Sequence, residues 1–315
     1  ISSKVINIVG GSNGAYFENS TEKTSIQGED ITIIGKEYNG IYLDGNGSLY
    51  LEGRNAYIKG ETNGIKLWNN GLNQGKITIK SDVINLSGET EDGILVDGKG
   101  NIVEIEGKNT FISGYRNGIE ALAGGEVIIN SDKTVISGGE IGIWMEEEGN
   151  TKIKSNEVTI FTTDKDNAWA AVYATQEGEI AIDSDNTNIS SEGGIGIRAQ
   201  SGNIVINANE KNVITSKDDI AVYATRDNDK IGKIVISSKS NEISGKEGVT
   251  VVGGEIEINS TEKTVILGEE HGVRSNSPGG KIDINSLNTI IKAQAENGVG
   301  IKASSGADLN INSTN

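Results

Sequence analysis

The sequence predicts an all-β protein, a single-domain right-handed parallel β-helix of about 12 turns of about 26 residues, with three short strands in each turn. Three observations lead to this fold class. A strand motif recurs at nearly constant spacing, Ile and Val alternate with polar residues, and 43 glycines stand against a single proline. Many glycines and little proline are typical of frequent tight turns between strands whose hydrogen-bond ladders are unbroken.

The recurring motif is a short strand of the form Gly-Ile-x-apolar. Successive copies begin 24 to 29 residues apart along the whole chain. The copies begin at Ala15, Ile41, Ile65, Ile94, Ile119, Ile143, Val172, Ile197, Val222, Val249, Val273 and Ile301. This period matches neither the hexapeptide repeat of left-handed β-helices nor the repeats of helical solenoids.

A turn dipeptide precedes many of these strands. Examples are Asn39-Gly40, Asn63-Gly64, Asp92-Gly93, Asn117-Gly118 and Asn297-Gly298. Because Asn, Asp and Gly tolerate positive φ angles, we expect a sharp corner of that conformation before the strand.

Two further strands follow within each turn. Residues 127–129 (Val-Ile-Ile) and 135–136 (Val-Ile) flank a polar corner at 130–134, and residues 256–258 and 265–266 repeat the arrangement. Apolar residues at alternate positions place one side chain in the core and the next in solvent. No turn can bury its apolar side chains alone, so the turns must stack. The sequence predicts one domain over residues 1–315, an excised segment of a longer surface protein.

Composition excludes several partners. A formal net charge of −17 disfavours nucleic acid, whose phosphates need basic residues, and also anionic lipid surfaces. No apolar run approaches the 18 residues of a membrane span, so we expect no direct membrane insertion by this segment. Without cysteine, the fold must be stabilised by burial rather than by disulfides.

The first strand of each turn identifies candidate binding residues. Its apolar pair, such as Ile143 and Met145, should point inward, so that the residue between them points outward. The outward residues that we expect to stack on adjacent turns, together with a nearby tryptophan, are Trp144, Tyr173, Arg198, Tyr223 and Trp169. Aromatic residues and Arg are enriched at binding hot spots, and flat aromatic rows suit sugar rings. The alternative is that this row only covers the sheet and stabilises it.

Catalytic and cofactor motifs are not apparent. Asp183 and Asp283, which lie within or beside middle strands, are four turns apart, too far to act as an acid and base pair. His271 has no cysteine or second histidine with which to form a transition-metal site. The sequence therefore predicts a protein that is not an enzyme and has no catalytic residues, metal or cofactor. A polysaccharide-degrading β-helix is the less favoured alternative.

The segments 117–139 (NGIEALAGGEVIINSDKTVISGG) and 193–215 (GGIGIRAQSGNIVINANEKNVIT) resemble the degenerate repeats of autotransporter passenger domains, the β-helical exported parts of type V secretion proteins in Gram-negative bacteria. The resemblance implies a segment at the outer-membrane surface or secreted, with roles in adhesion, aggregation or biofilm formation. It implies as partners a host cell-surface protein or glycan, or other bacterial cells. Alternatives within the same class are a passive stalk and a self-associating rod.

Overall fold

The computed structural model describes residues 1–19, 23–69, 74–304 and 306–314. Over these residues the protein is all-β and contains no helix. Contacts within the chain divide it into two compact units, residues 1–157 and residues 158–315, and the division falls within β14 (Asn150–Thr162). The expectation of a single domain over 1–315 stays a prediction.

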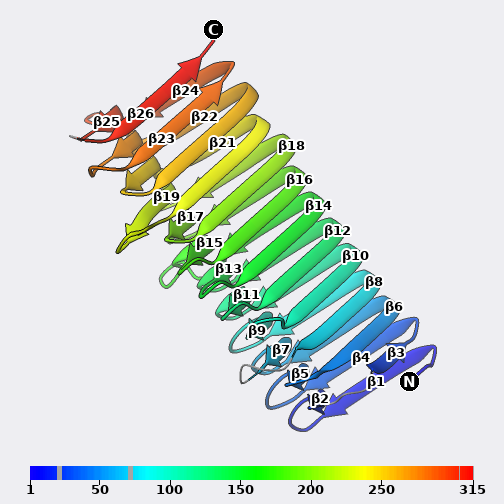
Figure 1. The fold of residues 1–315 in the computed structure, drawn as a ribbon. Coiled ribbons are helices and arrows are strands. Elements are labelled where there is room, and N and C mark those ends of the chain that lie inside the picture. The colour runs from blue at the N-terminus through cyan, green and yellow to red at the C-terminus, as the bar shows by residue number, and fades with distance from the viewer. Residues whose placement is uncertain (20–22, 70–73, 305, 315) are drawn as a thin grey trace. The chain divides into compact units, whose positions relative to one another are not determined.

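The first unit is a parallel β-solenoid in which short and long strands alternate along the chain from β5 on (Figure 1). Its strands are β1 (Val5–Gly10), β2 (Ala15–Glu18), β3 (Lys23–Gln27), β4 (Asp30–Gly35), β5 (Ile41–Asp44), β6 (Gly47–Gly60), β7 (Ile65–Trp68), β8 (Gly75–Gly88), β9 (Ile94–Asp97), β10 (Ile102–Gly114), β11 (Asn117–Leu122), β12 (Glu126–Gly138) and β13 (Ile141–Met145). The short strands β5, β7, β9, β11 and β13 pair in parallel, each with the next, as do the long strands β6, β8, β10 and β12.

The second unit repeats this arrangement. Its strands are β15 (Ala170–Thr175), β16 (Glu179–Ser191), β17 (Ile195–Gln200), β18 (Asn203–Ser216), β19 (Ile220–Asp227), β20 (Lys230–Ile231), β21 (Lys233–Val252), β22 (Glu255–Ser275), β23 (Lys281–Ser286), β24 (Asn288–Ala293), β25 (Val299–Ala303) and β26 (Asp308–Ser313). All pair in parallel except β20, which forms a small antiparallel hairpin with β19. The predicted parallel β-helix is thus confirmed in each unit.

The strands are longer than the sequence predicts. In β12 the predicted second and third strands, 127–129 and 135–136, run on as one strand across the polar corner. The corner keeps its hydrogen bonds to the neighbouring turn, because Asn130 and Ser131 pair with Glu106 and Gly107. In β21 and β22 one strand covers all three predicted segments. At the corners of these two strands the pairing shifts register, between Ser238 and Ser240 and between Gly245 and Glu247, and then resumes.

The core consists of in-register columns of Ile, Leu and Val. The side chains of Ile41, Ile65, Ile94 and Ile119 align on successive short strands and are fully buried. Complete burial of one such side chain contributes about 1.5–3 kcal/mol. The second inward position is also buried, and its residues become smaller in the second unit, where Ala174, Ala199 and Ala224 occupy it. The predicted inward pairs of these strands are therefore confirmed.

The turn dipeptides differ from the expectation of positive φ. None of Asn63, Gly64, Asn117 and Gly118 has a positive φ angle. Glycine is required by close approach instead. A Cβ atom on Gly118 would lie 2.5 Å from the Ile136 Cγ2 atom and 2.6 Å from the carbonyl oxygen of Gly142. The prediction of left-handed corners was wrong because the stacking of adjacent turns, rather than the local backbone angle, excludes a side chain there.

Candidate functional site

The predicted site residues of the second unit form a stacked row on adjacent strands. Tyr173 in β15 pairs in register with Arg198 in β17, which pairs with Tyr223 in β19. The Arg198 guanidinium carbon lies 5.0 Å from the ring centroid of Tyr173 and 5.9 Å from that of Tyr223. We refer to Tyr173, Arg198 and Tyr223 as the tyrosine–arginine row. A guanidinium between two aromatic faces is held by cation–π attraction.

Gln200 fixes one end of the row. Its Oε1 atom accepts hydrogen bonds from the Tyr173 hydroxyl at 3.1 Å and from the Arg198 Nη2 atom at 2.8 Å. Tyr173 is only 6% exposed, whereas Arg198 and Tyr223 are half-buried. The buried Nε atom of Arg198 has no hydrogen-bond partner among the described residues. A guanidinium carries five N–H donors, of which Nε is buried and one Nη2 donor is taken by Gln200, so the donors available to a ligand are those that remain on the two Nη atoms.

The two predicted tryptophans lie in different surroundings. Trp169, at the turn before β15, is 59% exposed and belongs to the second unit. Trp144, in β13, is half-buried and belongs to the first unit, where it pairs in register with Glu120. The joined row that the sequence predicts, with Trp144 stacked beside Tyr173, stays a prediction.

A second aromatic group, which the sequence reasoning did not select, lies on the short strands of the first unit. The Tyr16 and Tyr42 rings stack with their centroids 5.2 Å apart and an interplanar angle of 28°. The ammonium group of Lys66 lies 5.9 Å from the Tyr42 ring centroid. The sequence shows Tyr16, Tyr42 and Lys66 at the outward position of three successive short strands. The later strands of the turn that contains Tyr16 are, however, hard to recognise from the sequence.

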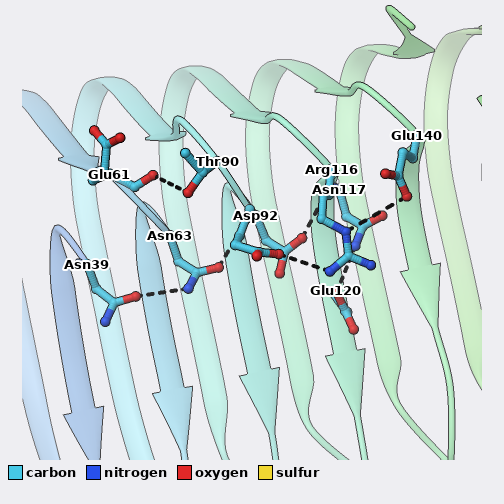
Figure 2. A network of polar contacts seen from close by, with 10 residues as sticks. Asn39, Glu61, Asn63, Thr90, Asp92, Arg116, Asn117, Glu120 and Glu140 are labelled. Carbon is cyan, nitrogen blue, oxygen red and sulfur yellow. Dashed lines mark hydrogen bonds and ion pairs between the residues drawn. The ribbon is translucent and has the colours of Figure 1, made fainter. Parts of the chain in front are cut away.

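A polar network runs along the corner before the short strands of the first unit (Figure 2). The Asn63 Nδ2 atom donates to Asn39 Oδ1 at 2.9 Å, and Asn63 Oδ1 accepts the backbone N–H of Asp92 at 3.1 Å. The backbone N–H of Asn117 in turn donates to Asp92 Oδ1 at 3.2 Å. The ladder gives each buried side chain a partner on the next turn, which offsets the cost of burying it.

Two buried carboxyl groups meet at the end of this ladder. Asp92 and Glu120 are 3% and 8% exposed, and Asn117 Nδ2 donates to Glu120 Oε2 at 2.7 Å. Desolvation by burial, with the negative charge of Glu120, raises the pKa of Asp92 to about 8. Burial also raises the pKa of Glu120, although its hydrogen bonds and Arg116 oppose the shift. Burial therefore favours a protonated Asp92 carboxyl group beside Glu120 in the fold.

The sequence reasoning missed this carboxyl pair. Asp92 lies at a corner, in a turn dipeptide, and Glu120 lies on the next short strand, so no single position of the repeat contains both acids. Charged residues surround the pair. The Arg116 guanidinium forms ion pairs with the carboxylates of Glu91, at 2.9 Å, and Glu140, at 3.8 Å. These ion pairs and the ladder hydrogen bonds explain the Asp92 and Glu120 pair as a structural part of the fold.

The second unit carries an acid–base cluster at the same corner. The Glu247 carboxylate is 8% exposed and accepts hydrogen bonds from Arg274 Nη1 and, at 2.5 Å, from Thr250 Oγ1. His271 Nδ1 lies 3.5 Å from the same carboxylate. Ligand atoms of Glu247, Glu270 and His271 lie within 4.8 Å of one another, a separation that could suit a metal ion. The Arg274 guanidinium on the Glu247 carboxylate supplies positive charge there, which opposes a cation. The absence of a metal stays a prediction.

We compared the chain with known proteins. No family model, no curated protein and no solved structure matches the chain. Among the residues that the structure describes, no helix is long and apolar enough to cross a membrane.

Proposed function

We propose that the chain is a non-catalytic binding segment of a bacterial surface adhesin, of the autotransporter passenger type, exposed on the outer membrane or secreted. It binds a host cell-surface protein or glycan, or a neighbouring cell, through a side face of the second unit. The observation that carries this proposal is the tyrosine–arginine row, which holds a half-buried guanidinium between two rings and leaves donors of its Nη atoms unused.

The chemistry of this face suits an oxygen-rich ligand. The Arg198 guanidinium is held in place by Tyr173, Tyr223 and Gln200, so little conformational entropy is lost when it binds a carboxylate or hydroxyl group. Trp169, at the turn that leads into the same face, offers an exposed flat ring for a sugar ring or a side chain. The Arg198 guanidinium and the Trp169 ring can each bind a ligand without catalysing a reaction.

A second candidate function is a passive stalk. It is favoured by the burial of Tyr173, whose ring is covered and whose hydroxyl already donates to Gln200. In this case the row only stabilises the sheet, as cross-strand aromatic pairs do. The two candidates differ in what happens when the exposed members of the face are removed.

Binding of the purified chain to host cells and to a broad glycan panel tests the proposal. The informative variant is Trp169→Ala/Arg198→Ala, and the matched control is Tyr115→Ala, which removes a 65% exposed ring from the first unit. We expect the wild type and the control to bind, and the double variant to lose at least tenfold in affinity while its β-sheet circular dichroism is unchanged. Equal binding by all three proteins would place the binding site elsewhere on the chain and overturn the role of this face, whereas no binding by any of them would favour the stalk.

A further inference from the structure

A column of neutral amide and hydroxyl side chains lies in the second unit at the polar corner that follows the middle strand segment of each turn. The column lies at the residue that directly follows the middle segment of each turn, on strands β18, β21, β22, β23 and β26. Its in-register members are Asn207, Ser237, Asn259, Asn285 and Asn312. Because parallel strands lie about 4.8 Å apart, the column is roughly 19 Å long.

Hydrogen bonds between the amides fix their orientation. Asn312 Nδ2 donates to Asn285 Oδ1 at 2.8 Å, and Asn285 Nδ2 donates to Asn259 Oδ1 at 3.0 Å. A primary amide has two N–H donors and an oxygen that accepts twice. Asn285 therefore uses one donor and one acceptor site within the ladder and retains one of each. Asn259 likewise accepts from Asn285 and donates to Glu257 Oε1 at 2.8 Å, so it also keeps one donor and one acceptor site. Asn259 and Asn285 thus present oriented donors and acceptors on two adjacent turns.

An open groove of about 760 Å³ runs beside this column. Its wall contains further hydroxyl and amide residues, such as Thr261 and Asn209, together with the side chain of Leu287, which is 40% exposed. The only charged residue that lines it, within the described part of the chain, is Lys239, whose ammonium group lies 2.5 Å from the Glu210 carboxylate. The charge of the wall is therefore compensated.

The same corner of the first unit has a different character. The in-register column there contains Glu52, Lys80 and Glu106, with an ion pair of 2.6 Å between Lys80 and Glu106. The hollow beside it is smaller, about 270 Å³, and is lined by charged residues and glycines as well as Ser81. The β-solenoid does not require amides at this corner. In the second unit the turn before the column carries a charged residue there, Asp183 of β16, which accepts a hydrogen bond from Asn207 Nδ2 at 3.0 Å. The neutral lining is therefore a property of the turns from β18 to β26.

We propose that the groove of the second unit binds a neutral polysaccharide in extended form, parallel to the column. A sugar chain presents hydroxyl groups that both donate and accept, which the remaining sites of Asn259 and Asn285 match. The spacing of the turns is close to the length of one hexose unit, so the same contacts can repeat along the chain. Leu287 offers an apolar contact for the C–H face of a ring. An acidic polysaccharide is disfavoured, because the lining contains no unpaired cation among the described residues and the protein carries a net charge of −17.

This site is separate from the tyrosine–arginine row, which lies on the short strands, and it stands independently of the adhesin proposal. Isothermal titration calorimetry of the full chain with soluble neutral polysaccharides (dextran, galactomannan and a mixed-linkage β-glucan), beside polygalacturonate, tests it. The groove variant is Thr261→Glu/Leu287→Glu, which places two carboxylates at exposed positions of the wall. The matched control, Thr163→Glu/Asn188→Glu, adds the same charge at exposed positions of the second unit outside the groove.

We expect at least one neutral polysaccharide to bind, polygalacturonate to bind at least tenfold more weakly, and the groove variant to lose tenfold or more in affinity while the control keeps the wild-type value. A disaccharide of the same polymer should bind at least tenfold more weakly than a hexasaccharide, because it spans fewer turns. The proposal is overturned if no neutral polysaccharide binds, or if the groove variant and the control bind equally. It is also overturned if Trp169→Ala/Arg198→Ala alone abolishes the binding, which would place the sugar on the tyrosine–arginine row.

Discussion

The side-chain amide of Asn63 donates to the side-chain oxygen of Asn39 on the preceding turn over 2.9 Å, in a position where both residues are nearly inaccessible to solvent. This contact joins two turns through side chains alone, in addition to the backbone ladder. It also explains why a corner residue that could be hydrophobic is polar: each amide satisfies a donor and an acceptor of its neighbours.

Removing one amide from this ladder should therefore weaken the first unit. Asn63→Ala leaves Asn39 Oδ1 and the backbone N–H of Asp92 without one partner each. We expect the free energy of unfolding to fall by about 1–3 kcal/mol, as for other buried groups left unpaired. The control is Asn130→Ala, an exposed amide on β12, which should change stability by less than about 0.5 kcal/mol. Urea unfolding followed by circular dichroism measures both, and equal losses would contradict the role of the ladder.

The buried carboxyl pair predicts a loss of stability as the pH rises. The pKa of Asp92 is about 8 in the fold against an ordinary value of 3.8, so between these values the folded protein holds a proton that the unfolded chain has released. The stability that this proton contributes is fully present below about pH 4, is lost progressively as the pH rises toward 8, and does not change further above pH 8. Thermal unfolding at pH 5, 7 and 9 should show a decreasing midpoint over this window.

The Asp92→Asn/Glu120→Gln variant isolates this effect. Neither replacement can ionise, and Asn at position 92 has the side chain that already occupies the corner at positions 63 and 117. Since one pKa unit corresponds to about 1.4 kcal/mol, we expect the variant to be at least about 1 kcal/mol more stable than the wild type at pH 9 and to match it at pH 5. A wild-type midpoint that rises from pH 5 to pH 9 relative to the variant would contradict the shared burial of the two acids.

The corner glycines predict a steric effect. Gly118→Ala places a Cβ atom 2.5 Å from the Ile136 Cγ2 atom and 2.6 Å from the carbonyl oxygen of Gly142, so a strand must move. We expect a loss of about 1–3 kcal/mol, typical of overpacking. Gly11→Ala is the control, because nothing lies within 4 Å of the added Cβ atom. A Gly118→Ala variant as stable as Gly11→Ala would show that the turns do not approach as closely as described.

The tyrosine–arginine row predicts a coupling energy between its members. A double-mutant cycle with Tyr223→Leu and Arg198→Met should give about 0.5–2 kcal/mol, the range for partly desolvated cation–π pairs. The single Arg198→Lys substitution should lose part of this energy, since an ammonium group does not stack as a flat guanidinium does. A coupling energy of zero would mean that the rings and the guanidinium are neighbours without interaction.

Much of the fold was predictable from the sequence, because burial imposes the same residue types at the same place in every turn. The columns that begin at Ile41, Ile65 and Ile94 are both the repeat that the sequence shows and the core that the structure contains. The strand boundaries were less predictable. The polar corner 130–134 looks like a break in sequence, but its backbone stays paired with the neighbouring turn.

The site was less predictable than the fold, because side-chain contacts between turns depend on register and on burial. The alignment of Tyr173, Arg198 and Tyr223 followed from the period, whereas the burial of Tyr173 did not, because it depends on the side chains that cover the ring. The approach of Asp92 to Glu120 joins a corner to a strand, and a search limited to one position of the repeat does not find it.

The measurement that tests the proposed function most directly is the dissociation constant of the purified chain for the strongest cell or glycan ligand of the binding panel. It should be compared between the wild type, Arg198→Lys and Trp169→Ala/Arg198→Ala, with Tyr115→Ala as the control. We expect wild-type affinity for the control, an intermediate loss for Arg198→Lys, and a loss of tenfold or more for the double variant. Unchanged affinity in a correctly folded double variant would contradict this expectation, and would leave the row as a purely structural part of the β-solenoid.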